Sequence, residues 1–274
     1  SHPYARHMVE RSDCLLMLGV WLTDTETGRF TSLIARGTLI QVLAAEVVIS
    51  RHRYRHTGLA EVLASLLESS EIKPRAFRND YVPEPIDTNG QSLVASVFAE
   101  LSRLEDAGYI FTTDTGDCLF GTVALNAETI LNPGYYASMG FGVPAALGAG
   151  LALPGCRPVV LVGDGGFQMT GMELGTLVRY GVDAIIVVLN NGGYRSLEAL
   201  GDRRTVWDLH PWDYVAVARA LGGEGTRVRT PEEFSTALQV ACDRAGVSLI
   251  EVVLAPEDIS PTLRRLSRTA GSSR

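Results

Sequence analysis

The chain has 274 residues, the length of one large domain or two ordinary ones, and 46% of them are hydrophobic, enough for a sizeable core. Its formal net charge of −7 argues against nucleic acid as a partner of the chain as a whole. The sequence has no run of about 18 apolar residues, and its polar start lacks a signal-peptide pattern, so we expect no membrane segment and no secretory leader.

The four cysteines are widely spaced and form no CxxC pair. This spacing argues against a disulfide framework and against a zinc site. Isolated cysteines in apolar surroundings are usually buried and inert, so we expect reduced thiols and a cytoplasmic protein. The positions are Cys14, Cys118, Cys156 and Cys242.

Residues 1–72 predict only part of an α/β domain. Short apolar runs at 14–20, 39–42 and 47–49 predict strands, and apolar residues at helical spacing within 59–67 predict a helix. So few strands cannot form a sheet that is covered on both faces. Because the chain also begins at a serine rather than a methionine, we expect a truncated sequence or one part of a split protein.

A linker is expected at 73–90, where prolines, Asp87 and Gly90 occur without apolar periodicity. In the domain expected at 91–256, helical and strand patterns alternate, which predicts a doubly wound parallel sheet. We expect the Arg- and Ser-rich tail, 257–274, to be disordered beyond Pro261. The expected helices are 92–104, 139–151, 172–180, 212–221 and 231–245, and the expected strands are 109–113, 158–162, 184–189 and 249–254.

Two polar clusters follow consecutive strands of this predicted sheet. The sequence GDGG (163–166) follows the first β-branched run, and NNGG (190–193) follows the next. Ligands of open α/β sheets bind beyond the carboxyl ends of the strands. Asp164 and Asn191 are 27 residues apart, about the length of one βαβ unit.

The residue types in these clusters suit a metal–diphosphate complex. Carboxylate and amide oxygens are hard ligands for Mg²⁺ or Ca²⁺, and Mg²⁺ completes its octahedron with water and phosphate oxygens. Glycines allow backbone amides to approach an anion, and the helix after Gly166 points its N-terminus at the site. Either segment alone also fits an ordinary turn, but the pair at adjacent strand ends favours a site.

GDG followed by NN at this distance resembles the signature of thiamine-diphosphate enzymes. The segment 163–194 is similar to the pyruvate, indolepyruvate and phenylpyruvate decarboxylases. The segment 12–32 resembles the second half of their Rossmann-like middle domain. Residues 114–121 and 135–152 resemble the front of their diphosphate-binding domain, and the likeness covers nearly all of 1–256.

The resemblance implies that Asp164, the side chain of Asn191 and the backbone carbonyl of Gly193 ligate magnesium. It also places Met139 under the thiazolium ring, where a bulky side chain bends the cofactor, with the backbones of Ala137 and Met139 on the aminopyrimidine. On the residues alone, Met139 also fits a core methionine that opens a helix. The further positions implied to contact diphosphate or thiazolium are Thr115, Asp117, Gly163, Gly165 and Gly166.

The family position that often carries a substrate-facing glutamate is Leu197 here. An apolar residue there resembles the phenylpyruvate type and implies a bulky aryl or alkyl 2-oxo acid. If the helix starts one residue differently, Glu198 takes this role; a solvated helix face is the alternative for Glu198. Asp24 matches a position near the substrate entrance or a subunit contact, but a loop-capping aspartate also explains it.

Two features of the family are missing from the segments that align. Its catalytic glutamate and, in many members, a His-His pair lie in a pyrimidine-binding domain of another subunit, and no two of the five histidines are adjacent here. We therefore expect a homo-oligomer that needs this domain from a second chain or a missing N-terminal region.

Two other sequence motifs have simpler explanations than a binding site. The GxGxxA pattern at 140–145 matches a dinucleotide fingerprint, but no convincing strand precedes it, and close helix packing explains its glycines. The basic run 51–56 can contact phosphate or RNA, but in an acidic chain a solvated face or subunit contact is the simpler interpretation.

The function expected from this resemblance is the Mg²⁺- and thiamine-diphosphate-dependent, non-oxidative decarboxylation of a 2-oxo acid to an aldehyde. The alternatives are a carboligase of the acetolactate synthase or benzoylformate decarboxylase type, and a non-catalytic fragment or cofactor-binding subunit. The sequence TDTETGRF (23–30) and the WDY sequence ending at Tyr214 favour the decarboxylase.

Overall fold

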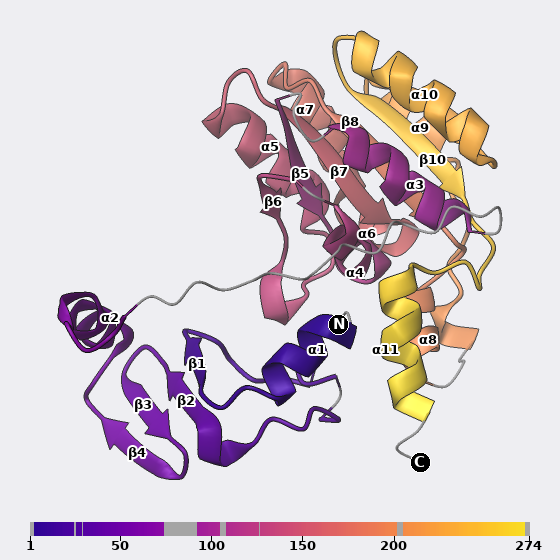
Figure 1. Ribbon diagram of the computed structural model, residues 1–274. Coiled ribbons are helices and arrows are strands. Elements are labelled where there is room, and N and C mark those ends of the chain that lie inside the picture. Colours follow the sequence, from indigo (N-terminus) through magenta and orange to yellow (C-terminus); the bar gives the residue numbers. More distant parts are fainter. Residues whose placement is uncertain are drawn as a thin grey trace. The chain divides into compact units, whose positions relative to one another are not determined.

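The computed structural model (Figure 1) describes residues 3–24, 26–28, 30–73, 92–104, 108–125, 127–201 and 205–271. The chain divides into two compact units, Ser1–Pro83 and Glu84–Ser272. The linker predicted at 73–90 lies, apart from Lys73, outside the described residues. No helix in the described parts of the chain combines the length and the apolar character needed to cross a membrane.

The first unit contains a four-stranded mixed sheet in the order β1-β2-β3-β4. β1 and β2 are parallel, whereas β3 pairs antiparallel with both β2 and β4. The basic run 51–56, expected to be a solvated face or a subunit contact, contains the edge strand β4, and all four residues of that strand are exposed. The elements are α1 (Pro3–Glu10), β1 (Leu15–Leu18), β2 (Leu39–Val42), β3 (Glu46–Ile49), β4 (His52–Arg55) and α2 (Leu59–Glu68).

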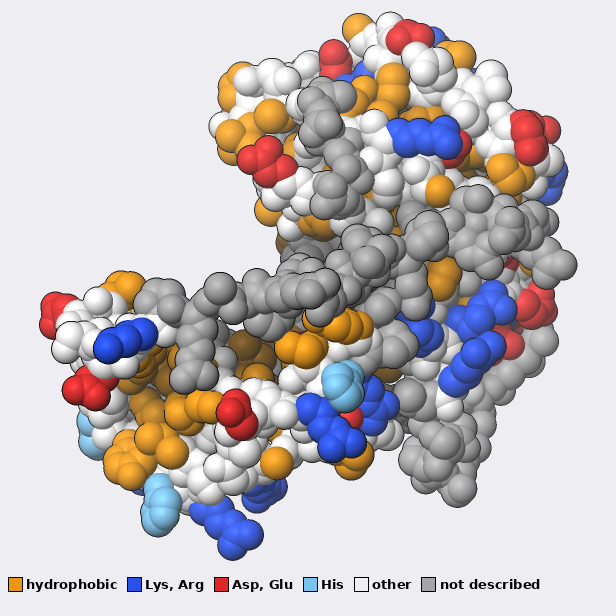
Figure 2. All heavy atoms as spheres, in the orientation of Figure 1, with side chains coloured by type: hydrophobic (Ala, Val, Ile, Leu, Met, Phe, Trp, Pro, Cys, Tyr) orange, Lys and Arg blue, Asp and Glu red, His pale blue; other side chains and the backbone are white. Residues whose placement is uncertain are grey.

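This first sheet has little buried core. Of the hydrophobic residues described in the unit, only Val42 and Val47 are buried. Leu16 and Leu18 of β1 are 41% and 39% exposed, and Trp21 is 63% exposed. Figure 2 shows hydrophobic side chains gathered on the surface of this unit. The partial α/β domain expected at 1–72 stays a prediction, and the described strands bury little apolar surface.

The second unit contains a six-stranded sheet in the order β6-β5-β7-β8-β10-β9, and every pairing in it is parallel. Its strands are β5 (Tyr109–Thr113), β6 (Ile130–Leu131), β7 (Arg157–Gly163), β8 (Ile185–Asn190), β9 (Glu224–Val228) and β10 (Ser248–Val253). Its helices are α3 (Leu93–Leu101), α4 (Asp117–Gly121), α5 (Gly142–Ala152), α6 (Asp164–Thr170), α7 (Leu174–Arg179), α8 (Arg195–Leu200), α9 (Tyr214–Ala220), α10 (Pro231–Asp243) and α11 (Pro261–Gly271).

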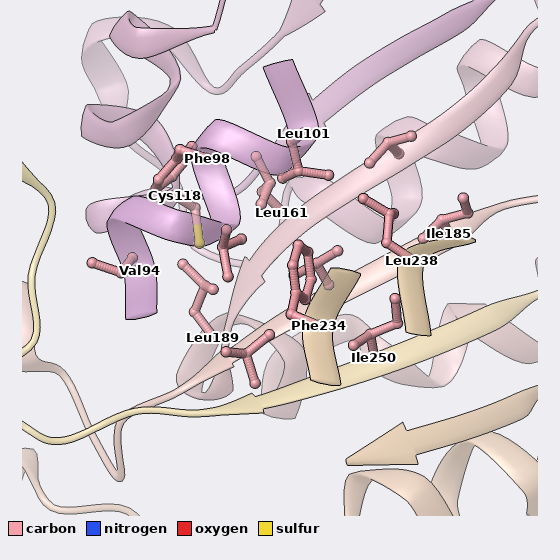
Figure 3. Close-up of a cluster of buried hydrophobic side chains, with 14 of the residues drawn as sticks. Val94, Phe98, Leu101, Cys118, Leu161, Ile185, Leu189, Phe234, Leu238 and Ile250 are labelled. Atoms are coloured by element: carbon pink, nitrogen blue, oxygen red, sulfur yellow. The ribbon is translucent and has the colours of Figure 1, made fainter. Parts of the chain in front are cut away.

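Helices cover both faces of this sheet, so the predicted doubly wound fold is confirmed (Figure 1). Side chains of α3 and α10 form one core with alternate residues of the strands, such as Leu161 and Ile185 (Figure 3). Side chains of α5, α7 and α9 form a second core with the intervening residues, such as Val160 and Ile186. Because both faces of β7 and β8 are buried, their sequences are continuous apolar runs rather than alternating ones.

Several elements differ from those predicted. The helix expected at 139–151 begins only at Gly142, and the crossover expected at 172–180 starts much earlier, with α6 directly at Asp164. The edge strands β6 and β9 were not predicted. β6 has two residues, and β9 has the burial pattern of an exposed edge, so neither carries a long apolar run.

The expectation of disorder beyond Pro261 is wrong, because α11 (Pro261–Gly271) is a helix. It packs against α8 and α4, and Leu263 is fully buried. The Ser260 hydroxyl accepts a hydrogen bond from the amide of Leu263 at 3.2 Å, which caps the helix. Local composition suggested a solvated tail, whereas tertiary contacts order it.

The cysteines are free thiols, as expected. Cys118 is buried, and burial raises the pKa of its thiol well above the usual value. The expected burial is wrong for Cys14, which is exposed on the first unit, and incomplete for Cys156 and Cys242.

Candidate functional site

The two polar clusters meet at the carboxyl edge of the second sheet. β7 and β8 are adjacent and parallel, and Gly163 pairs with Leu189 in their register. Neighbouring strands lie about 4.8 Å apart, so the residues that follow this pair lie side by side. Asp164 is therefore beside the start of the NNGG loop, as the sequence predicts.

Two buried oxygen atoms at this edge lack partners. Asp164 is 3% exposed, and its Oδ1 accepts a hydrogen bond from the amide of Gly165 at 2.8 Å. Its Oδ2 and the Oδ1 of Asn191 are both buried, and neither has a hydrogen-bond partner among the described residues. An unsatisfied buried polar atom costs about 1–3 kcal/mol. A cation between the two oxygens would remove this cost.

Burial raises the pKa of the Asp164 carboxyl group to about 6. The hydrogen bond from the Gly165 amide opposes this rise, as do the nearby amides of Gly192 and Gly193 and the positive charge of Arg195. The loop after β8 therefore turns its amides toward the carboxylate at the end of β7. A divalent cation would favour the ionised form further.

The donor set fits magnesium bound with phosphate. The Gly193 carbonyl accepts a hydrogen bond from the amide of Arg195 at 2.9 Å, and its second lone pair remains available. Among the described residues no group of three or more His, Cys, Asp or Glu side chains could hold a metal. One carboxylate, one amide oxygen and one carbonyl suit Mg²⁺ only if a ligand supplies further oxygens.

Packing within the chain requires three of the site glycines. A Cβ atom on Gly165 would lie 2.2 Å from the ring of Tyr194, and one on Gly166 would lie 2.7 Å from Oδ1 of Asp114. A Cβ atom on Gly193 would lie 2.2 Å from the carbonyl oxygen of Trp207. At Gly163, by contrast, nothing lies within 4 Å of the added atom. Gly165, Gly166 and Gly193 are thus needed because other parts of the protein pack closely against them, and not only because an anion is expected to bind there.

Asp114 is an organising residue that the sequence analysis missed. It is 1% exposed and lies directly after β5. Its carboxylate accepts hydrogen bonds from the amides of Thr115 at 3.0 Å, Gly140 at 3.2 Å and Gly142 at 3.0 Å. The loop after β5 and the loop before α5 are therefore joined beside the GDGG turn. The sequence signal was an aspartate directly following the predicted strand 109–113.

Thr115 and Asp117 lie on either side of the turn that starts α4. Thr115 is half-buried, and Asp117 accepts a hydrogen bond through Oδ2 from the amide of Ser260 at 2.6 Å. Burial raises the pKa of Asp117 to about 6, and the charge of Asp258 adds to the rise. Asp117 thus holds the start of α11, while its Oδ1 is buried without a partner among the described residues.

Ala137 and Met139 lie in the loop before α5. Ala137 has a left-handed backbone, with φ of 52°, and ends a 3₁₀ turn at Gly134–Tyr136. Met139 is half-buried in the following turn rather than opening a helix, because α5 begins three residues later. The hydroxyl of Thr170 donates a hydrogen bond to the Gly140 carbonyl at 2.8 Å, which ties this loop to α6.

Leu197 and Glu198 lie on α8, directly after the NNGG loop. Leu197 is 47% exposed, whereas Glu198 forms an ion pair with Arg195 at 2.9 Å. A Cβ atom on Gly116 would lie 2.9 Å from the hydroxyl of Ser196, so α8 adjoins the turn that carries Thr115. Asp24 lies in an exposed turn of the first unit, and its carbonyl accepts a hydrogen bond from the Thr27 hydroxyl at 3.4 Å.

A family model described as the C-terminal TPP-binding domain of thiamine pyrophosphate enzymes matches residues 114–252. The chain belongs to this family. The matched range contains the GDGG and NNGG segments. The cofactor of this family, thiamine pyrophosphate, is another name for thiamine diphosphate. Thiamine diphosphate carries phosphate oxygens of the kind that a magnesium ion between Asp164 and Asn191 would need as further ligands.

Several curated relatives of the chain are named as decarboxylases. The indole-3-pyruvate decarboxylase of Azospirillum brasilense is 34% identical over 266 residues, which cover 94% of this chain and 49% of that protein. An alpha-keto-acid decarboxylase of Mycolicibacterium paratuberculosis is 29% identical over 284 residues, which cover 98% of this chain and 50% of that protein. The chain spans about half the length of the curated relatives it matches.

A solved structure is also similar. The thiamine diphosphate-dependent 4-hydroxybenzoylformate decarboxylase of Rhodococcus jostii RHA1 matches with a TM-score of 0.56 and 26% identity, over 71% of this chain and 38% of that one.

Proposed function

We propose that this chain is the magnesium- and diphosphate-binding part of a thiamine-diphosphate-dependent decarboxylase that converts a 2-oxo acid to an aldehyde. The observation that carries the proposal is the pair of buried oxygens on Asp164 and Asn191 that have no hydrogen-bond partner in the described parts of the chain, at adjacent strand ends inside the matched family domain. The names of the curated relatives support the reaction.

In this proposal the metal ligands are Asp164, the side chain of Asn191 and the carbonyl of Gly193. The open position of Gly163 and the N-terminus of α6 accept the diphosphate, with Thr115 beside it. Gly165 and Gly166 allow the loops around them to close up, and Asp117 fixes the turn after Thr115. When bound, thiamine diphosphate supplies a thiazolium ring that accepts the electron pair left behind as carbon dioxide departs.

The loop before α5 would hold the rest of the cofactor. The left-handed backbone at Ala137 turns the chain just before Met139, and the link from Thr170 to Gly140 keeps that turn against α6. We propose that the Met139 side chain supports the thiazolium ring and that the backbones of Ala137 and Met139 bind the aminopyrimidine. Their task is to orient the cofactor relative to the diphosphate site.

Leu197 is the proposed substrate-facing residue. It is exposed at the start of α8, next to the metal loop, whereas the carboxylate of Glu198 is engaged by Arg195. An apolar side chain here favours a bulky aryl or alkyl 2-oxo acid, and the indole-3-pyruvate decarboxylase relative supports that class. Glu198 remains the second candidate for this position.

The proposal includes a partner. Because the chain spans about half of its curated relatives, a pyrimidine-binding domain from a second chain or from an N-terminal region would complete the site. We propose a homo-oligomer that works in the cytoplasm.

Calorimetric titration of the full gene product with thiamine diphosphate, with and without Mg²⁺, tests the site. We expect Mg²⁺-dependent binding that Asp164→Ala abolishes, because the diphosphate charge is then left uncompensated. The matched control is Asp183→Ala, since Asp183 precedes β8 at the opposite edge of the sheet and accepts a hydrogen bond from the amide of Gly246. Unchanged affinity in Asp164→Ala would refute the assignment.

A carboligase of the acetolactate synthase or benzoylformate decarboxylase type is the second candidate, because it shares the GDG and NN segments; the similar Rhodococcus structure is itself named as a 4-hydroxybenzoylformate decarboxylase. Product analysis separates the two. Aldehyde and carbon dioxide from phenylpyruvate or indolepyruvate support the decarboxylase, whereas acyloin formed from pyruvate, without aldehyde, supports the carboligase. Release of neither product by a cofactor-loaded protein would support a non-catalytic binding subunit.

A further inference from the structure

The guanidinium group of Arg195 lies at the centre of the loop that follows β8. The residue is 8% exposed, although arginine side chains are rarely buried. Its Nε donates to the carbonyl of Asn191 at 3.2 Å, and its Nη2 donates to the carbonyl of Gly192 at 3.1 Å. Its Nη1 contacts Glu198 at 2.9 Å and Asp208 at 2.8 Å. One side chain therefore joins the loop backbone to two carboxylates.

These contacts fix the backbone that directly follows the Asn191 side chain. The loop is also held from its other side, because the amide of Leu209 donates to the Gly192 carbonyl at 3.1 Å and the amide of Tyr194 donates to the Trp207 carbonyl at 2.9 Å. Gly193 pairs with Asp208 in an isolated antiparallel bridge. Since Arg195 also binds Asp208, it connects both sides of this bridge.

The geometry of the group matters as well as its charge. A planar guanidinium can donate to two carbonyls and two carboxylates at once, whereas a lysine ammonium is a point charge with three donors. The two carboxylates satisfy the buried positive charge. Without Arg195, the carbonyls of Asn191 and Gly192 would each lose a buried donor, and the loop would depend on its bonds to residues 207–209.

We propose that Arg195 is a positioning residue for the metal site: it holds the NNGG loop so that Oδ1 of Asn191 and the carbonyl of Gly193 face the cation. The inference rests on the proposed function. It gives the carboxylates of Glu198 and Asp208 the task of holding Arg195 in place. Leu197, the neighbour of Glu198, remains the residue that faces the substrate.

The test measures metal affinity rather than activity alone. Mn²⁺ binding to the full-length protein in the presence of thiamine diphosphate is followed by electron paramagnetic resonance, for wild type, Arg195→Met and Arg195→Lys. Losing a partner that orients metal ligands typically costs about 10–100-fold in metal affinity. We expect a loss in this range for Arg195→Met, a smaller loss for Arg195→Lys, and recovery of decarboxylation in both at saturating metal.

Arg157→Met is the matched control. Arg157 also donates to backbone carbonyls, those of Cys242 at 2.9 Å and Arg244 at 2.8 Å, but it lies at the first residue of β7, roughly 20 Å of strand from Asp164. We expect this variant to lose stability in urea while its Mn²⁺ affinity stays within about twofold of wild type. Asp208→Asn, which keeps the arginine, should lower the affinity less than Arg195→Met and serves if that variant fails to fold.

The outcomes separate the two proposals. Wild-type Mn²⁺ affinity in both Arg195→Met and Asp208→Asn, or an equal loss of affinity in Arg157→Met, overturns the positioning role and leaves the proposed function intact. A wild-type protein that binds neither Mn²⁺ nor thiamine diphosphate overturns both.

Discussion

The two units of this chain place similar secondary structure in very different surroundings. In the second unit, each face of the sheet is buried under helices, and the central strands β7 and β8 are buried along nearly their whole length. In the first unit, α2 has no buried residue, and alternate residues of β1 are exposed. An apolar strand such as β1 is therefore not by itself evidence of a core. A core also needs helices that pack against the strand. Burial on two faces separates a self-sufficient sheet from a partial one.

The largest expected effect comes from dividing the chain. We expect a fragment of residues 84–274 to unfold cooperatively in urea, because its core is complete, and a fragment of residues 1–83 to show no cooperative transition, because it buries too little apolar surface to offset the entropy of ordering. Circular dichroism during urea titration measures both. A steep transition in the smaller fragment would break the comparison.

The next effect compares one leucine from each unit. Leu161→Ala should cost about 2–5 kcal/mol of unfolding free energy, because the side chain is fully buried between strands and helices. Leu16→Ala, at 41% exposure, should stay within about 0.5 kcal/mol. Chemical denaturation of the whole chain gives both values, and similar losses would show that the first unit has a core of its own.

A glycine pair sharpens the comparison at the site. Gly165→Ala should cost about 1–3 kcal/mol, because the added Cβ atom would lie 2.2 Å from the Tyr194 ring. Gly37→Ala in the first unit meets nothing within 4 Å and should be neutral or slightly stabilising. Thermal unfolding of the two variants provides the measurement. An unchanged melting temperature in Gly165→Ala would show that the GDGG turn can accommodate a Cβ atom at this position.

The last comparison is the pH dependence of stability that one carboxyl group contributes in each unit. Burial raises the pKa of Asp117 in the second unit to about 6, so folding favours its protonated form. The contribution of this group is fully present below pH 4 and is lost as pH rises through about 6, at a cost of about 1–3 kcal/mol. Asp117→Asn should remove that dependence in urea unfolding measured between pH 4 and 7.

Glu10 of the first unit should behave in the opposite way. A hydrogen bond from the amide of Leu33 lowers its pKa, so its contribution is present above its unfolded pKa and is lost as pH falls. Glu10→Gln should therefore leave stability unchanged at the acidic end of the titration and reduce it slightly at neutral pH. Equal pH slopes for the Asp117 and Glu10 variants would contradict the assigned environments.

The sequence by itself determined the parallel sheet and the edge of the sheet at which the GDGG and NNGG segments meet. The runs at 158–162 and 184–189 are apolar because both faces of their strands are buried, and such a pattern is visible without any contact information. The polar residues that follow them, Asp164 and Asn191, had to lie together once the strands were adjacent and parallel. These predictions depend on local periodicity and on the direction of strands alone.

Only the tertiary structure decided which residues hold that edge in shape. Asp114 accepts hydrogen bonds from amides 26 and 28 residues away, and Arg195 joins the NNGG loop to Asp208. The order of α11, which the sequence predicted as a loose tail, likewise comes from its packing on α4 and α8. Each of these contacts joins segments that are separated in the sequence. Local sequence patterns cannot predict such contacts, because the segments come together only after the sheet and its crossover helices have formed.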